Sequence, residues 1–231
     1  MTPRSIEQLI SKQIRQWHLH QELIRLEGTE APLRPRPVIT ISREKGSGGM
    51  DLALSLCRRL DYQIHGRSLI DQIAGDEGLE RKIAEQLDER TRSEIDLWVQ
   101  GLLNRRLFSQ NAYHTSVAKV IKSLAAHGGA IILGRGAHVI LGGDNCLRVR
   151  VISPLDVRVA RVCEDEGIGE DAARELIATS DEERADYHRK LYDVVPNDPY
   201  QYDLVLNTER IHGGRAVTLV LAAMEVRGLF G

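Results

Sequence analysis

A glycine-rich segment around residue 46 has the composition of a phosphate-binding turn. The sequence Gly46-Ser47-Gly48-Gly49 follows a short β-branched run, Val38-Ile39-Thr40-Ile41-Ser42, and precedes leucines at helical spacing (Leu52, Leu56 and Leu60). A strand that enters such a turn and continues as a helix directs backbone N–H groups and the positive helix end toward an anion. The segment therefore predicts a cradle for phosphate, with a tight turn that binds no ligand as the alternative.

This segment departs from the common phosphate-loop pattern GxxxxGK[ST]. Aligned on Gly48, the first glycine of the pattern is Arg43, the lysine is Gly49, and the serine or threonine is Met50. Lys45 or Arg43 is the candidate for the missing positive charge, and Ser47 is the candidate hydroxyl. The predicted phosphate-binding residues are Arg43, Lys45, Gly46, Ser47, Gly48, Gly49 and Met50.

Arginines stand at further positions where phosphate chemistry would need them. The planar fork of donors in arginine suits the oxygens of a transferring phosphoryl group better than lysine does. Arg135 follows the apolar run Ala130-Ile131-Ile132-Leu133, and parallel sheets bind ligands outside the carboxyl ends of their strands. Arg158 and Arg161 are one helical turn apart and therefore share a face, which on its own is also typical of a solvated surface.

A strongly charged segment is the last candidate for chemistry. Asp181-Glu182-Glu183-Arg184 is expected to open a helix that continues through Arg189 and Lys190. Such a helix is either a lid that closes over a ligand or an exposed surface helix, and the pattern alone favours the surface helix.

These residues must be positioned by alternating strands and helices. Strands are predicted at Val38–Ser42, Ala130–Leu133, Leu147–Ile152 and Asp203–Asn207. Helical patterns occupy most of Asp76–His127 and the range Arg215–Val226. A further helix is expected to begin with Ser153 as its cap and Pro154 at its first position. This order predicts an α/β protein with a mainly parallel sheet covered by helices on both faces.

The N-terminal residues form a separate unit in this prediction. Apolar residues recur at helical spacing from Ser5 to Leu26, so residues 1–30 are expected to form an amphipathic helix. Three prolines in residues 32–37 predict an extended linker over residues 31–37. The apolar face of the helix must be covered either by the remaining chain or by a second copy in a homo-oligomer.

Composition excludes several classes of protein. The content of 42% hydrophobic and 28% charged residues is that of an ordinary globular protein, and the net charge of -2 argues against a nucleic-acid partner. Three scattered cysteines without a CxxC pair, no apolar run near the roughly 20 residues that span a bilayer, and a charged N-terminus predict a cytoplasmic protein without membrane contact. No histidine spacing suggests zinc, so no protein metal site is predicted.

Five motifs occur in an order that resembles the cytidylate kinase-like family. They are ITISREKGSGG, IILGRGAHVIL, RVISPLDVRVARV, DEERADYHRKLY and YDLVLNT. The resemblance runs from about Val38 to Met224 and implies a nucleoside monophosphate kinase-like P-loop domain over residues 38–231. It also implies a helical insertion that binds the monophosphate and a lid that closes over ATP.

The resemblance assigns roles residue by residue. It implies that Lys45 to Gly49 hold the ATP phosphates, that Arg135 contacts phosphate on the acceptor side, and that Arg184 closes from the lid. Arg135, Arg184 and Asp181 are therefore the candidate catalytic residues. Arg158 and Arg161 match the helix leading into the lid, whereas Asn207 and Thr208 match the strand-end loop near the nucleotide base. The family often has an aromatic-Asp pair where this chain has His65-Gly66, so that carboxylate is absent.

Three functions follow from these observations. The first is transfer of the ATP γ-phosphoryl group, with Mg²⁺, to a nucleoside monophosphate such as CMP. The second is a nucleotide-binding regulatory module that kept the phosphate cradle and lost turnover, which the altered loop would allow. The third is a kinase with another small phosphoryl acceptor, because residues 66–127 depart most from the pattern and a fold does not fix a substrate.

Overall fold

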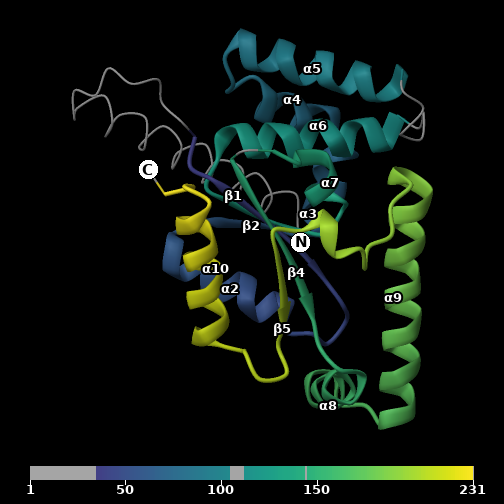
Figure 1. Ribbon diagram of the computed structural model, residues 1–231. Coiled ribbons are helices and arrows are strands. Elements are labelled where there is room, and N and C mark those ends of the chain that lie inside the picture. Colours follow the sequence, from purple (N-terminus) through teal and green to yellow (C-terminus); the bar gives the residue numbers. More distant parts are fainter. Residues whose placement is uncertain (1–34, 105–111, 144, 231) are drawn as a thin grey trace.

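The structure is a computed structural model that describes residues 35–104, 112–143 and 145–230 (Figure 1). The predicted amphipathic helix within residues 1–30 and most of the predicted linker lie outside the described residues. Their prediction therefore stands as made, as do the domain boundaries.

A parallel sheet forms the centre of the described chain. Its five strands follow the order β2-β3-β1-β4-β5. Their bounds are β1 (Val38–Arg43), β2 (Gln63–His65), β3 (Ala130–Leu133), β4 (Cys146–Ile152) and β5 (Leu204–Asn207). All four pairings are parallel, with Ile39 opposite both Ile131 and Leu147 in the middle of the sheet. The predicted α/β class with a mainly parallel sheet is confirmed.

Helices cover both faces because successive strand residues point to opposite sides. Ile39 and Ile41 of β1 pack with α2 (Gly49–Leu60) and α10 (Gly214–Val226) in one core cluster. Val38 and neighbouring residues of β3 and β4 pack in a second cluster on the other face. That second cluster is covered by α3 (Arg67–Ala74), α6 (Ala112–His127) and α7 (Ala137–Leu141). The strands β1 and β3 in the middle of the sheet are thus almost entirely buried, whereas the edge strand β5 is partly exposed.

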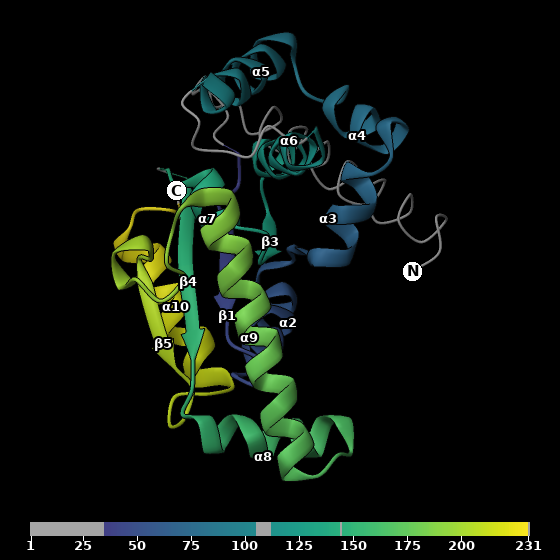
Figure 2. The same cartoon turned by 90° about the vertical axis from the view of Figure 1, so that its right-hand side faces the viewer.

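Two helical excursions leave the sheet. Between β2 and β3 the chain forms α3, α4 (Glu77–Ala84), α5 (Glu89–Asn104) and α6. Between β4 and β5 it forms α8 (Leu155–Glu166), α9 (Glu170–Tyr192) and a short 3-10 helix (Pro199–Gln201). Figure 2 shows α9 running past the sheet from α8 at its lower end to α7 at its upper end. The first excursion corresponds to the predicted helical insertion and the second to the predicted lid.

Sequence patterns missed one of these elements and misplaced the start of two helices. The strand β2 was not predicted, because three residues are too few for a period-2 pattern. Asp181 does not open a helix, since α9 begins eleven residues earlier at Glu170 and passes through Asp181 without interruption. Ser153 is no helix cap: Pro154 occupies that position without a side-chain hydrogen bond, and the buried Ser153 hydroxyl has no partner among the described residues.

Candidate functional site

A glycine loop, residues 44–48, connects β1 to α2. Gly46 and Gly48 have φ angles of 77° and 74°, a left-handed conformation that side chains other than glycine adopt at a cost. A Cβ at Gly46 would lie 2.8 Å from the carbonyl oxygen of Arg158, so close approach also requires glycine there. The Ser47 hydroxyl donates to the Glu44 carbonyl oxygen at 2.9 Å and is buried. Ser47 therefore closes the turn, and its hydroxyl does not face a ligand.

Arg158 and Arg161 approach this loop from α8, on the helix face that they share. The Nη1 of Arg158 lies 3.4 Å from the Lys45 carbonyl oxygen, and the Nη1 of Arg161 lies 3.4 Å from that of Gly46. Arg161 also donates to the Thr208 hydroxyl at 2.9 Å, and that hydroxyl donates to the Ser47 carbonyl oxygen at 2.7 Å. The loop is thus held between α8 and the residue that follows β5.

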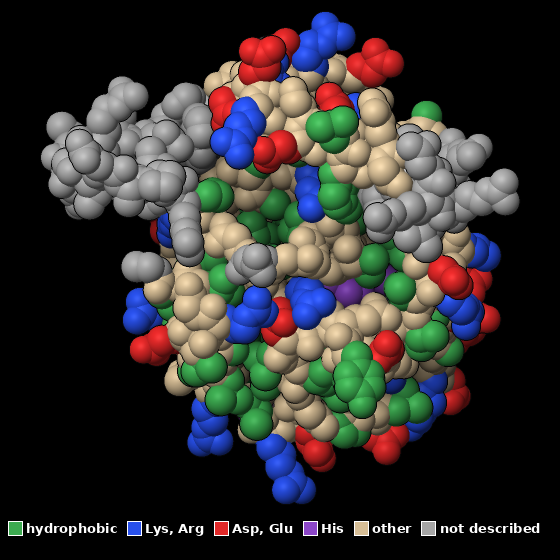
Figure 3. Space-filling view, turned by 45° about the horizontal axis from the view of Figure 1, so that its top comes forward, with side chains coloured by type: hydrophobic (Ala, Val, Ile, Leu, Met, Phe, Trp, Pro, Cys, Tyr) green, Lys and Arg blue, Asp and Glu red, His purple; other side chains and the backbone are tan. Residues whose placement is uncertain are grey.

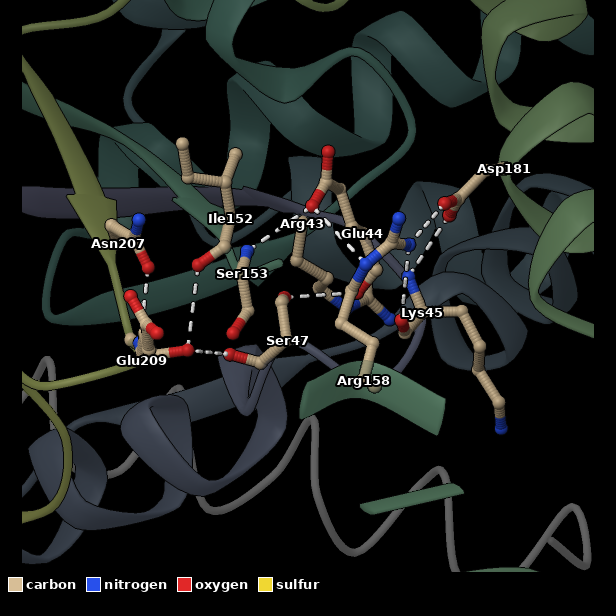
Figure 4. Close-up of polar contacts among 12 residues, drawn as sticks. Arg43, Glu44, Lys45, Ser47, Ile152, Ser153, Arg158, Asp181, Asn207 and Glu209 are labelled. Atoms are coloured by element: carbon tan, nitrogen blue, oxygen red, sulfur yellow. Dashed lines mark hydrogen bonds and ion pairs between the residues drawn. The ribbon is translucent and has the colours of Figure 1, made fainter. Parts of the chain in front are cut away.

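Asp181 reaches the glycine loop from the middle of α9. Its Oδ1 accepts a hydrogen bond from the Lys45 backbone N–H at 2.9 Å, and its Oδ2 pairs with Arg158 (Figure 4). Arg184, one turn further along α9, lies 3.4 Å from the same carboxylate and donates to the Arg43 carbonyl oxygen at 3.1 Å. An acidic side chain therefore holds a loop N–H and two arginines, the donors that suit a phosphate group.

The guanidinium of Arg43 lies beside this group without a carboxylate partner. Within the described ranges it forms no ion pair, and burial together with the nearby Arg184 lowers the pKa of Arg43 to about 10. The pKa of Arg184 is also lowered, first by burial and then by Arg150 and Arg67, although Asp181 opposes this shift. Desolvated cations that repel one another favour an anion between them.

Lys45 and Met50 do not face the loop, contrary to prediction. The Lys45 ammonium forms an ion pair with Glu166 at 2.6 Å, at the far end of α8. Figure 4 shows this side chain directed away from Arg158 and Asp181. Met50 lies in the first turn of α2 with 46% of its surface exposed. Of the two candidates for the missing charge, only Arg43 has a charged group without a carboxylate partner among the described residues.

A cavity of about 280 Å³ adjoins the loop on the side of α2 and α10. Gly48, Arg161 and Thr208 line it, together with Asp51, Leu52, Ser55, His212, Gly213 and Ala216. Asn207 is not among the residues that line the cavity. Its side chain accepts a hydrogen bond from the Glu209 N–H at 3.0 Å. Thr208, rather than Asn207, therefore connects the strand-end loop to the candidate nucleotide site.

Arg135 lies at a second group of polar residues, outside the carboxyl end of β3. It has a φ of 54° and stands between two glycines that are also left-handed, so the chain turns sharply there. Its guanidinium pairs with Asp71 of α3 and lies 4.9 Å from the ring centre of Tyr187. Burial, followed by a hydrogen bond to Asp71, raises the pKa of Tyr113 to about 12.

Two buried polar atoms at this group have no hydrogen-bond partner among the described residues. They are the Oδ1 of Asp71 and the Nε of Arg135. Buried polar atoms are normally paired, so such atoms point to a ligand or water. Sequence reasoning did not find Asp71, because a lone aspartate within a helical pattern carries no signal until its partner is known. Asp71, on the helix that follows Gly66, supplies a carboxylate near the position where the aromatic-Asp pair of the family is replaced by His65-Gly66.

A larger cavity of about 370 Å³ lies elsewhere, beneath α5 near the amino ends of β1 and β4. Its lining is mostly apolar and includes Val38, Trp98 and Leu141. Figure 3 looks toward this side and shows hydrophobic side chains in a hollow, while Lys, Arg, Asp and Glu side chains are interspersed around it. Lacking the glycine loop and the arginines, this cavity is not the candidate phosphate site.

The parallel sheet, glycine loop and surrounding arginines define an α/β protein of the nucleotide kinase type. The model of the cytidylate kinase-like family matches residues 38–210, and the chain belongs to this family. The resemblance inferred from the five motifs is confirmed.

Two cytidylate kinases are among the relatives of this chain. The cytidylate kinase of Methanopyrus kandleri is 25% identical over 198 residues, which cover 81% of this chain and 93% of that protein. The cytidylate kinase of Methanothrix thermoacetophila is 28% identical over 189 residues, covering 81% and 98%. A uronate isomerase of Corynebacterium glutamicum is 36% identical over 98 residues, but the chain spans only 19% of that protein.

A solved structure shows the same fold. The crystal structure of an uncharacterized protein from Eubacterium ventriosum matches with a TM-score of 0.66 and 22% identity. The match covers 83% of this chain and 99% of that one.

The described residues include no group of three or more His, Cys, Asp or Glu side chains that would hold a metal ion by themselves. Mg²⁺ bound with a nucleotide, however, commonly uses one or two carboxylates together with phosphate oxygens. Glu44 follows β1 directly and lies at the loop, where its carboxylate pairs with Arg158. In the described part of the chain, no helix combines the length and apolar character required to cross a membrane.

Proposed function

We propose that this protein transfers the γ-phosphoryl group of ATP to a nucleoside monophosphate, with CMP as the first acceptor to test. Family membership supports nucleotide kinase-type phosphoryl transfer in general. The observation that carries the specific proposal is the pair of buried cations next to the glycine loop: Arg43, which has no carboxylate partner among the described residues, and Arg184, which shares the Asp181 carboxylate with Arg158.

The donors divide into two groups. Loop N–H groups with Arg158 and Arg161 would hold the ATP phosphates, and the cavity beside Thr208 would receive the base. Arg135 and its partner Asp71 would receive the acceptor. A phosphoryl group in transfer spreads negative charge over its equatorial oxygens, so donors on both sides of it stabilise the transition state.

Arg184 and Asp181 have linked roles in this proposal. In the structure, Asp181 accepts a hydrogen bond from the Lys45 N–H and pairs with Arg158 and Arg184. Nucleotide phosphates would replace the carboxylate, and Arg184 would then turn to the transferring group as α9 closes. This exchange couples lid position to nucleotide binding, because both anions need the same donors.

Mg²⁺ would be held at the loop by Glu44 and by phosphate oxygens. When bound, the ion would neutralise charge on the phosphates. Glu44 is positioned for this by Arg158, whose Nε lies 3.6 Å from its Oε2, and by the Ser153 N–H at 3.2 Å.

The decisive experiment measures diphosphate formation from ATP, Mg²⁺ and a panel of nucleoside monophosphates. Turnover of one monophosphate, lost in Arg135→Ala and retained in a variant of the exposed Arg59, supports the proposal. ATP binding without turnover of any acceptor would instead favour the regulatory module. Turnover of a small hydroxyl compound but of no monophosphate would favour a kinase with another acceptor.

A further inference from the structure

Two departures from the GxxxxGK[ST] pattern are spatially related. Arg43 stands where the pattern has its first glycine, and Gly49 stands where it has its lysine. Arg43 is the last residue of β1, and Gly49 is the first residue of α2. The five intervening residues fold back so that the two positions meet.

The side chain of Arg43 fills the space in which a side chain at position 49 would begin. A Cβ built on Gly49 would lie 2.8 Å from the Cβ of Arg43 and 3.2 Å from both its Cγ and its Cδ. Separations below about 3 Å are repulsive for carbon atoms, whose favourable distance is about 3.5–4.0 Å. Gly49 has no left-handed backbone angle, so its conformation alone does not require glycine. The packing of Arg43 does.

The guanidinium of Arg43 extends from this contact toward the acceptor side of the site. Its Nη1 would lie 3.2 Å from a Cβ built on Gly134, the residue that precedes Arg135. Arg43 therefore spans the distance between the start of α2 and the end of β3. A phosphoryl group passing from one side to the other would cross this position.

Other cations near the loop are already engaged. Lys45 pairs with Glu166, and Arg158 pairs with both Asp181 and Glu44. Among the described residues Arg43 has no such carboxylate. Its charge is therefore left for a ligand.

We propose that Arg43 contacts the nucleotide phosphates in place of the loop lysine, and that Gly49 is glycine because the Arg43 side chain occupies the lysine's place. The inference rests on the proposed function and identifies the cation that its phosphate site uses. Compared with the GxxxxGK[ST] pattern, the positive charge is therefore at the end of β1 and not at the start of α2. An arginine at this position offers a fork of donors to two phosphate oxygens, whereas lysine offers a point charge.

A double-mutant cycle tests the exchange of positions. Gly49→Lys alone should lower the thermal midpoint strongly, because its stem would overlap Arg43. Arg43→Gly should relieve that overlap, so the double variant Arg43→Gly/Gly49→Lys should regain most of the loss. Strong positive coupling between the two substitutions supports the packing argument. Equal loss of stability in Gly49→Lys and in the double variant would overturn it.

Calorimetric binding of ATP and of inorganic tripolyphosphate tests whether the positive charge of Arg43 contacts phosphate. Arg43→Ala should weaken both ligands by about 10- to 100-fold, the loss of one charge-assisted contact of about 1.5–3 kcal/mol. Arg43→Lys should recover part of this affinity, and Arg43→Gly/Gly49→Lys should recover more than Arg43→Gly. The control Arg59→Ala, an exposed arginine of α2, removes the same charge and should leave affinity within about twofold.

The outcomes separate this inference from the proposed function. A folded Arg43→Ala variant that binds both ligands as tightly as the parent would overturn the role of Arg43, while the kinase proposal would survive. If the parent bound neither ATP nor tripolyphosphate, the proposed function and the phosphate role of Arg43 would both fall. The stability cycle would still decide whether Arg43 and Gly49 exchange positions.

Discussion

Replacing Asp181 with asparagine should tighten ATP binding, although Asp181 stands within the candidate site. The aspartate accepts the Lys45 N–H and pairs with Arg158 and Arg184, so a phosphate group must displace it before using those donors. Asparagine keeps the volume and one acceptor oxygen but loses the charge. The substitution therefore weakens the competitor without altering the shape of the loop.

The magnitude follows from the partial exposure of these side chains. The Asp181 side chain is 29% exposed, and those of Arg158 and Arg184 are 11% and 31% exposed. Hydrogen bonds to charged groups contribute about 1.5–3 kcal/mol, and exposed ion pairs contribute about 0–1 kcal/mol. A net cost of about 1.4 kcal/mol lies between these values and corresponds to about tenfold in affinity. The nucleotide-free variant should lose a similar amount of unfolding free energy.

Calorimetry with ATP in the presence of EDTA measures this effect without a contribution from Mg²⁺, and urea unfolding measures the stability. Glu182→Gln is the matched control, because it removes the same charge from the neighbouring, exposed position on α9. The reasoning is refuted if Asp181→Asn binds ATP with unchanged or weaker affinity, or if Glu182→Gln tightens binding equally.

Three further outcomes are expected. Gly136→Ala should lower the free energy of unfolding by about 3 kcal/mol or more, because the new Cβ would overlap the ring of Tyr192 in α9. Gly167→Ala is the control: it has the same φ of 67° but open space around its Cβ, so chemical unfolding should show a loss of only about 1–2 kcal/mol. Asp71→Asn should raise the acceptor KM about tenfold and leave the ATP KM within about twofold in steady-state assays, because it orients Arg135; equal effects on both substrates would contradict this. Burial, and then His127, lowers the pKa of His65 to about 4. The unfolded chain with its ordinary pKa near 6.5 therefore binds more protons, and stability should fall by up to about 1.4 kcal/mol per pH unit from about pH 6.5 to about pH 4; urea unfolding of a His65→Leu variant should show a flatter profile.

Local patterns predicted much of the fold. The strands β1, β3, β4 and β5 were found within one residue of their observed bounds, because short apolar runs rich in β-branched residues indicate strands. β2 was missed, and the start of α9 was misplaced at Asp181, since a charged helix without a cap signal has no clear beginning in the sequence.

The candidate site was predictable only in outline. Glycine spacing located the loop, and helical spacing placed Arg158 and Arg161 on one helix face, but only the structure shows that this face meets the loop. Sequence could not show that Asp71 would meet Arg135, because 64 residues separate the two. Asp181 likewise reaches Lys45 across 136 residues.

The sequence by itself determined four of the five described strands, the glycine turn around Gly46 and Gly48, and the two cations beside that turn, Arg43 and Lys45, because these depend on backbone preferences and on neighbours within a few residues. The tertiary structure decided which of those cations lacks a partner. Lys45 meets Glu166 only because α8 packs beside the loop, and Arg43 stays without a carboxylate because the groups near its guanidinium are Arg184 and Gly134. A charge acquires its energy from its distance to other charges and from its burial, and both are fixed only when the distant segments have packed together.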